Sequence, residues 1–176
     1  SLRGTGIGVV EQQAGRIRGL AYDVLRNPPA RPLSDCLVHI QNSLNAILDE
    51  FHPDVVAVEG VFFSRYVKTT LILGEARGVV IATCAAAGLP IYEYAPRRVK
   101  QAVVGYGAAT KQQIQAMVVQ QLGLGKPPPE DAADALCERW ADPVVAGELD
   151  IGLMPEASGI AVSARGEIAF TVMPLL

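Results

Sequence analysis

Apolar residues recur at steps of three and four between Leu33 and Phe51, with polar residues between them. This period places the apolar side chains on one face of an amphipathic helix. Pro53 follows, and because the residue before a proline is disfavoured in a helix, we expect the helix to end at His52. The apolar positions are Leu33, Cys36, Leu37, Ile40, Leu44, Ile47, Leu48 and Phe51.

Later helices are predicted mainly from the residues at their ends. Gly88 follows a long segment rich in Leu, Ile, Val and Ala, and glycine suits a helix C-cap. Pro96 fits the first turn of a helix, where its missing N–H is tolerated. Thr110 and Gln113 form a capping-box pattern. The predicted segments are 68–87, a helix opening at Pro96, 110–122 and 130–140.

Four segments are predicted to be strands. Gly6 to Val10 and Arg16 to Tyr22 are compatible with β-structure, with Glu11 to Gly15 as the turn between them. Val55 to Val58 is apolar without alternation, which is typical of a strand covered on both faces. Leu89 to Tyr94 is another short strand. Strands come first and then alternate with helices, which predicts an α/β domain with a mixed sheet flanked by helices.

After Asp142 the chain no longer alternates between predicted strands and helices. Gly159 to Val162 and Glu167 to Met173 are β-like, with a short polar link between them. They are expected to form an additional hairpin or a loosely packed extension. We therefore expect one α/β domain over residues 1–141, followed by an extension of unassigned role over residues 142–176.

The composition fits one intracellular globular domain. Of 176 residues, 50% are apolar and 19% are charged, which excludes a disordered chain. Charged residues or glycines interrupt the longest apolar stretches, so none is expected to cross a membrane, and no signal peptide is recognised. Three widely spaced cysteines argue against a disulfide framework or a zinc site, and they favour the reducing cytoplasm. The net charge of −3 does not by itself indicate nucleic-acid binding.

Three acidic residues are candidates for metal binding. Asp131 and Asp134 are three positions apart, so on a helix they lie on one side about one turn apart. Their mutual repulsion is relieved when a cation lies between them. Glu59 follows the buried strand 55–58, at the edge where ligands bind in open α/β sheets. The alternative for Glu59 is an ordinary solvated strand end. The alternative for Asp131 and Asp134 is stabilisation by the helix dipole, which explains Asp131 better than Asp134, about one turn further into the helix.

Basic and aromatic residues follow several of the predicted strands. Phosphate contacts from such lysines and arginines supply DNA affinity that is independent of sequence, and aromatic rings stack on unpaired bases. Solvated surface is the alternative for the basic residues, and core packing is the alternative for one of the two adjacent phenylalanines. The candidates are Phe62, Phe63, Arg65, Lys68, Arg77, Arg98, Lys100 and Lys111.

Five motifs occur in order over about residues 1–140. They are Ser1-Leu2-Arg3-Gly4-Thr5-Gly6, Val56-Ala57-Val58-Glu59-Gly60-Val61-Phe62, Leu73-Gly74-Glu75-Ala76-Arg77-Gly78, Tyr94-Ala95-Pro96-Arg97-Arg98-Val99-Lys100-Gln101-Ala102-Val103-Val104-Gly105 and Asp131-Ala132-Ala133-Asp134-Ala135-Leu136. As an ordered set they resemble the RuvC family of Holliday-junction resolvases.

The resemblance implies a ribonuclease-H-like fold, a homodimer and paired, Mg²⁺-dependent nicking of four-way DNA junctions in recombination and repair. Two Mg²⁺ ions are expected in each active site, with Mn²⁺ as a substitute. Glu59, Asp131 and Asp134 match three of the family's four catalytic acids. Phe62 resembles the aromatic residue that contacts DNA near the crossover, and Lys100 and Lys111 fall where the family has DNA-contacting lysines. A branch-migration complex of the RuvA and RuvB type is the implied partner.

The chain departs from the family pattern at its start. In the family, the opening glycine-rich segment follows a strand that ends in Gly-Ile-Asp-Pro and supplies the fourth acid. Here the first acid is Glu11, and the chain begins with Ser1 rather than Met. Asp150 lies in a context that does not match the missing motif. On this basis we expect the central strand to be absent and cleavage to be suppressed.

Three alternatives remain open from the sequence. The first is a protein that binds branched DNA without cutting it. The second is a ribonuclease-H-like nuclease that acts on RNA or on RNA–DNA hybrids, against which the segment 97–101 argues. The third is a small-molecule-binding α/β domain, for which we find no glycine-rich phosphate loop.

Overall fold

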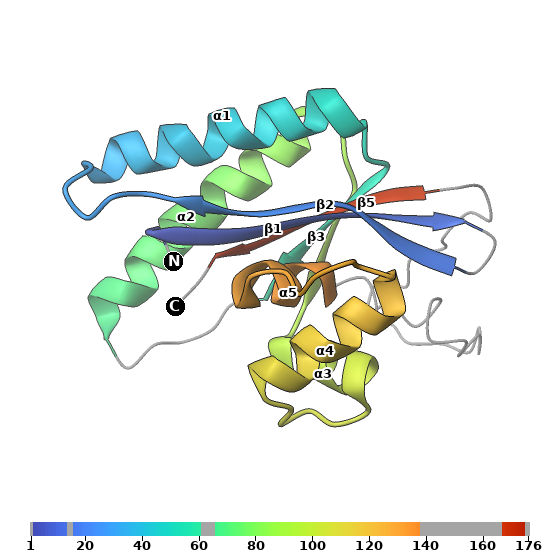
Figure 1. The fold of residues 1–176 in the computed structure, drawn as a ribbon. Coiled ribbons are helices and arrows are strands. Elements are labelled where there is room, and N and C mark those ends of the chain that lie inside the picture. Colours follow the sequence, from blue (N-terminus) through green and yellow to red (C-terminus); the bar gives the residue numbers. More distant parts are fainter. Residues whose placement is uncertain (1, 14–15, 61–65, 138–166, 175–176) are drawn as a thin grey trace, which may run out of the picture.

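The computed structural model describes residues 2–13, 16–60, 66–137 and 167–174 (Figure 1). Within these residues a five-stranded sheet has the order β2-β1-β5-β3-β4. The elements are β1 (Gly4–Gln13), β2 (Arg16–Arg26), α1 (Leu33–Phe51), β3 (Val55–Glu59), α2 (Val67–Ala86), β4 (Ile91–Tyr94), α3 (Pro96–Val104), α4 (Lys111–Leu122), α5 (Glu130–Cys137) and β5 (Glu167–Pro174). The mixed sheet, with an antiparallel opening and parallel pairs later, confirms the predicted α/β architecture.

The hairpin of β1 and β2 is longer than the sequence predicted. Residues 11–13 belong to β1 and pair with β2, so placing the turn over Glu11 to Gly15 was wrong for them. Glu11 pairs with Arg18 across the strands, with Arg18 Nε 2.6 Å from Glu11 Oε2. An opposite-charge pair at facing positions favours continuation of the ladder. The register shifts once, between Val9 and Val10.

The middle of the sheet is occupied by β5, from the C-terminal part of the chain. It runs antiparallel to β1 and parallel to β3. The β-character predicted for residues 167–173 is therefore confirmed, but their place is neither a separate hairpin nor a loose extension. The structure also corrects the expectation that the sheet lacks its central strand. Gly159 to Val162 lies outside the described residues, and the boundary at residue 141 remains a prediction.

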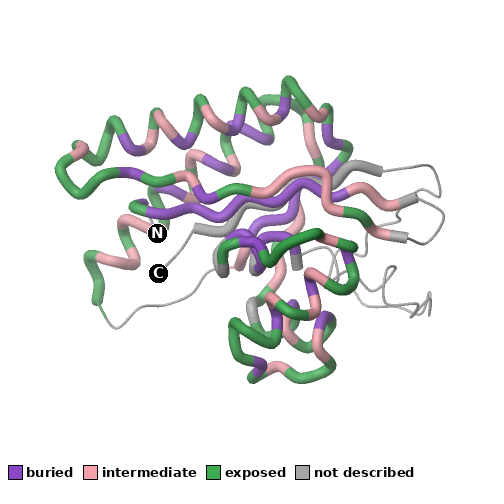
Figure 2. Tube along the Cα trace, in the orientation of Figure 1, coloured by how far each residue is buried: buried purple, intermediate pink, exposed green. Residues whose placement is uncertain are grey.

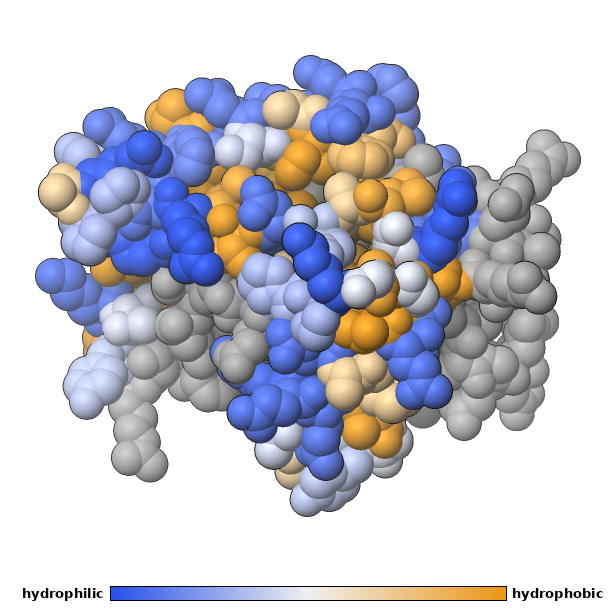
Figure 3. Space-filling model, in the orientation of Figure 1, coloured by the Kyte–Doolittle hydropathy of each residue, from blue (hydrophilic) through white to orange (hydrophobic). Residues whose placement is uncertain are grey.

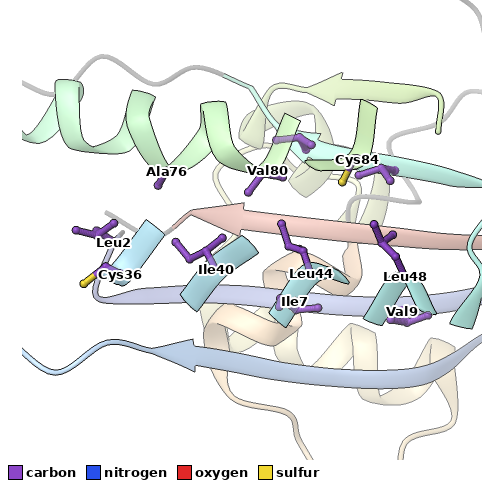
Figure 4. Packing of buried hydrophobic residues seen from close by; sticks show 12 residues of the cluster. Leu2, Ile7, Val9, Cys36, Ile40, Leu44, Leu48, Ala76, Val80 and Cys84 are labelled. Atoms are coloured by element: carbon purple, nitrogen blue, oxygen red, sulfur yellow. The ribbon is translucent and has the colours of Figure 1, made fainter. Parts of the chain in front are cut away.

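Helices cover both faces of the sheet and create two hydrophobic cores (Figure 1). On one face, α1 and α2 pack over β1 and β3. Figure 4 shows Ile40, Leu44 and Leu48 of α1 directed toward the space between α2 and the sheet. On the other face, α3, α4 and α5 pack together. Its buried residues are Val10, Val55, Val99, Val103, Ala109, Ile114, Val118, Leu122 and Leu136. Figure 2 shows the buried positions concentrated along the strands.

The predicted helix ends agree well with the structure. His52 follows α1 in the left-handed conformation, with φ of 47°. Gly88 has φ of 76°, a conformation that glycine adopts without steric cost, just beyond α2. The capping box at α4 is complete, because the Thr110 hydroxyl accepts from the Gln113 N–H and the Gln113 side chain accepts from the Thr110 N–H. Local chemistry therefore determines where these helices begin and end.

Candidate metal centre and nucleic-acid interface

Glu59 is the last residue of β3 and is partly exposed. Side chains alternate between the two faces of a strand. Val56 and Val58 belong to the core beneath α1 and α2, whereas Val55 belongs to the core beneath α3, α4 and α5. Glu59 is an even number of positions from Val55, so it shares the face that carries α5. Beyond it, the Gly60 N–H donates to the Tyr94 carbonyl at 2.8 Å, which continues the pairing with β4.

The helix α5 packs closely on the sheet because Gly8 of β1 has no side chain to keep the helix away. A Cβ at Gly8 would lie 3.0 Å from the backbone nitrogen of Leu136, so a larger residue at position 8 would push the helix away. The connector before α5 is anchored by the Gln115 side-chain amide, which donates to the Pro128 carbonyl. The residues of α5 that fill this interface are fully buried and mostly small: Ala132, Ala133, Ala135 and Leu136.

Asp131 and Asp134 belong to the same helix, α5. The helix is placed, but both carboxylates lie outside the part of the molecule that the structure describes. Among the described side chains, no group of three His, Cys, Asp or Glu residues forms a metal site. The structure thus places α5 and Glu59 on the same face of the sheet. That the carboxylates of Glu59, Asp131 and Asp134 lie close together remains a prediction.

The strand β5 lies between Glu59 and β1. Val58 pairs with Val172, so the next residues along the two parallel strands are Glu59 and Met173. On its other side, Met173 pairs with Gly6 of β1. Sequence reasoning did not connect position 173 with the candidate metal centre, because no local pattern in the tail indicates which strands it joins.

The predicted DNA-binding residues fall into three groups in the structure. Arg98, Lys100 and Lys111 lie on α3 and α4, the helices that cover the same face as α5; Arg98 and Lys111 are exposed and Lys100 is half-buried. Figure 3 shows hydrophilic side chains mixed with apolar ones over this part of the molecule. Lys68 and Arg77 lie on α2, which covers the opposite face. Phe62, Phe63 and Arg65 lie outside the described residues.

Arg77 is directed into the protein rather than toward solvent. Its side chain is only 17% exposed and is paired with the Glu93 carboxylate of β4. Its Nε also donates to the backbone carbonyl of Glu59, at 3.4 Å. Sequence reasoning treated Arg77 as a DNA contact and missed both partners, since neither lies near it in the sequence.

The cysteines that the structure describes are core residues, as predicted. Cys36 and Cys84 are buried and free. Burial raises the pKa of the Cys84 thiol to about 11, so the thiol stays protonated near neutral pH and is a poor nucleophile. The side chain of Cys137 lies outside the described residues.

Comparison with known proteins identifies the family. The family profile described as crossover junction endodeoxyribonuclease RuvC matches residues 1–138. The chain belongs to the RuvC family. A RuvC from Syntrophomonas wolfei is 47% identical over 133 residues, covering 75% of this chain and 77% of the relative. A RuvC from Chloroflexus aggregans is 45% identical over 145 residues, covering 80% and 88%. Both bear the name crossover junction endodeoxyribonuclease.

Solved structures of RuvC agree with the fold. The Thermus thermophilus RuvC in complex with a Holliday junction substrate superposes with a TM-score of 0.74 at 35% identity, covering 80% of this chain and 87% of that one. A second structure of Thermus thermophilus RuvC gives 0.73 at 34% identity, with coverage of 84% and 91%. The ribonuclease-H-like fold implied by the motifs is confirmed. As a RuvC family member, the chain is an endonuclease of the hydrolase class, and the family is metal-dependent.

Proposed function

We propose that this chain resolves Holliday junctions in the cytoplasm by paired, Mg²⁺-dependent nicking during DNA recombination and repair. The observation that carries the proposal is the placement of Glu59 at the end of β3 on the sheet face that α5 covers. Membership of the RuvC family supports the reaction class. The relative solved with a Holliday junction supports the substrate.

The donor set fits a hard divalent cation. Glu59, Asp131 and Asp134 offer only carboxylate oxygens, which Mg²⁺ prefers and which Mn²⁺ also accepts. We assign the binding of two Mg²⁺ ions to these residues. When bound, the ions activate the attacking water and stabilise the leaving oxygen of the phosphodiester. The protein's own contribution is to carry the three carboxylates on the end of β3 and on α5.

The DNA contacts are assigned to the face of the sheet that carries α3, α4 and α5. Arg98, Lys100 and Lys111 are proposed to hold backbone phosphates, which fixes the position of the junction without reading its sequence. Phe62, Phe63 and Arg65 follow Glu59 closely in the sequence and are proposed to contact the bases near the crossover. Lys68 is proposed as a further phosphate contact. A complex of the RuvA and RuvB type is proposed to deliver the junction.

A homodimer is proposed to use the outer face of α2. Val67 and Leu71 are 73% and 62% exposed, and the exposed residues Gly74 and Gly78 follow them at helical spacing. A Cβ at Gly74 or Gly78 would meet nothing within 4 Å, so a second helix has room to approach closely. An apolar, exposed stripe of this kind marks an interface. Two-fold symmetry would present two active sites to opposing strands of a junction.

The same helix also has the length and composition of a membrane span, contrary to the expectation from the sequence. Among the described residues it is the one such helix, and 22% of its apolar 18-residue window is buried. A single helix of this kind is a weak indication of a membrane segment. Because α2 packs on the sheet with one face and exposes an apolar stripe on the other, we assign the stripe to the dimer.

Substituting Leu71→Glu is expected to weaken dimerisation at least thirtyfold, on the order expected for a central interface residue. A charge in the middle of the apolar stripe must lose its hydration when two copies meet. Light scattering coupled to size exclusion measures the mass directly. Val38→Glu, at a position 53% exposed on α1, is the matched control and should leave the mass unchanged. An unchanged mass for Leu71→Glu would place the interface elsewhere.

The register of β5 gives a second prediction, a gain of metal affinity. In Met173→Asp, a carboxylate is introduced beside Glu59 on the neighbouring strand. We expect affinity for Mn²⁺, measured by titration calorimetry, to rise roughly tenfold, because added ligand charge strengthens binding of hard cations. Met173→Leu is the control and should not change it. If Met173→Asp and Met173→Leu had equal affinities for Mn²⁺, position 173 would not be part of the metal centre.

Cleavage of a plasmid cruciform with Mg²⁺ tests the proposed reaction, using the chain and the Met173→Asp variant in parallel. The proposal predicts symmetric nicks in opposing strands that disappear with a chelator, and more nicking by the variant. Junction binding without nicking by either protein would favour a non-catalytic DNA-binding protein. Preferential cleavage of an RNA–DNA hybrid would favour a different ribonuclease-H-like activity.

A further inference from the structure

Arg77 connects three secondary-structure elements at the end of the strand that carries Glu59. It projects from α2, whose neighbouring residue Ala76 is buried at 1% exposure. Its Nη2 lies 2.5 Å from Glu93 Oε2 on β4. The alignment is that of an ion pair rather than a linear hydrogen bond. Its Nε points to the main-chain carbonyl of Glu59. One side chain thus holds both strand ends from the face opposite α5.

The contact of Arg77 with Glu59 is made to the backbone carbonyl. Val58 pairs with Glu93, and Glu59 pairs with Tyr94, so the Arg77–Glu93 pair lies beside the last rungs of the β3–β4 ladder. The Gly60 N–H donates to the Tyr94 carbonyl, so Glu59 lies next to the last pairing of β3 with β4 among the described residues. A carbonyl fixed at residue 59 restricts the backbone torsions that determine where the Glu59 carboxylate is directed.

We propose that Arg77 is a positioning residue for the metal centre, acting through the backbone of Glu59, and not a contact to DNA. The assignment rests on the proposed function, because it requires Glu59 to bind the metal. Outer-shell groups that orient a ligand typically change metal affinity or activity 10- to 100-fold when removed. A guanidinium suits this task, since its rigid fork reaches a carboxylate and a carbonyl together.

The experiment compares Arg77→Gln with Arg98→Gln in the full chain, using Mn²⁺ as the probe. For Arg77→Gln we expect Mn²⁺ affinity to fall roughly tenfold, with no change in junction affinity or in its dependence on salt. For Arg98→Gln we expect unchanged Mn²⁺ affinity, weaker junction binding and a salt slope lower by about one. A lower salt slope for Arg77→Gln, with normal Mn²⁺ affinity, would make Arg77 a phosphate contact and overturn the proposal.

Two further variants guard against a purely structural explanation. Arg77→Lys keeps the charge for Glu93 but loses the fork, so it should recover the thermal stability lost in Arg77→Gln and recover Mn²⁺ affinity only in part. Glu93→Gln removes the ion pair and leaves the Glu59 carbonyl contact, so its effect on Mn²⁺ should be smaller than that of Arg77→Gln. Full recovery of Mn²⁺ affinity by Arg77→Lys, or an equal loss in Glu93→Gln, would contradict the carbonyl contact.

Failure of the positioning role is distinguishable from failure of the metal centre itself. If Glu59→Gln weakens Mn²⁺ binding and Arg77→Gln does not, the metal centre stands and the positioning role is wrong. If Glu59→Gln leaves Mn²⁺ binding unchanged, the proposed function fails at its metal site, whatever Arg77 does.

Discussion

Replacing Glu59 by Gln is expected to reduce the rate of junction nicking on the order of a hundredfold or more and to weaken Mn²⁺ binding by at least about tenfold. The substitution keeps the size of the side chain and removes the charge that a divalent ion needs. Glu59 is at the end of β3 and partly exposed, so the fold should tolerate the change. Single-turnover nicking of a cruciform and calorimetric Mn²⁺ titration measure the two effects.

The matched control for this prediction is Glu50→Gln. Glu50 is an exposed glutamate near the end of α1, before the first residue of β3, whereas Glu59 is the last residue of that strand. Glu50→Gln changes the net charge of the protein by the same amount as Glu59→Gln but leaves the metal centre intact. Both nicking and Mn²⁺ binding should therefore stay at the level of the unsubstituted chain. If the two variants lost nicking and Mn²⁺ affinity equally, the cause would be the change in net charge. Normal Mn²⁺ binding by Glu59→Gln would remove Glu59 from the metal centre.

Substituting Thr171→Pro is expected to unfold the sheet under conditions in which the unsubstituted chain is folded. Thr171 pairs with Gly8 on one side and Ala57 on the other, so it lies in the middle of the central strand. Proline cannot donate to the strand ladder and is confined essentially to edge strands and bulges, so in the middle of a central strand we expect it to cost roughly 3 kcal/mol or more. Many domains of this size have total stabilities of about 5–15 kcal/mol. Urea denaturation followed by circular dichroism measures the loss.

Thr171→Val provides the control for the strand substitution. Valine is β-branched, favours strands and keeps the backbone N–H, so the free energy of unfolding should change by less than about 1 kcal/mol. A Thr171→Pro variant as stable as the Val variant would mean that β5 does not hold the centre of the sheet in solution. The assignment of Met173 to the neighbourhood of Glu59 would then fail as well.

The sequence predicted those parts of the fold that local chemistry determines. The helix from Leu33 to Phe51 carries its own apolar period, and the α4 start carries its own capping box, so both were placed closely. Strand β3 was recognised because it is apolar on both faces. Its neighbour β5 was recognised as β-like, but its partners are more than a hundred residues away in the sequence. Such pairing depends on tertiary packing, which no local pattern encodes.

For the candidate site, too, the sequence predicted the residue with a local signal but not the contacts between distant residues. Glu59 follows a buried strand, which is a local signal for the ligand edge of a sheet, and the structure places it there. The contacts of Arg77 with Glu93 and with the Glu59 carbonyl were not predictable, because they join residues from three separate elements. A basic residue in the middle of an apolar helix was the one available signal. Where burial makes a lone charge costly, such a residue points to an internal partner.

The most direct test of the account is a crystal structure of the chain soaked in Mn²⁺, with the metal located by anomalous scattering. We predict Mn²⁺ held by the carboxylates of Glu59, Asp131 and Asp134, on the side of the sheet covered by α5. Mn²⁺ bound only at other residues, with Glu59 turned away from α5, would contradict it.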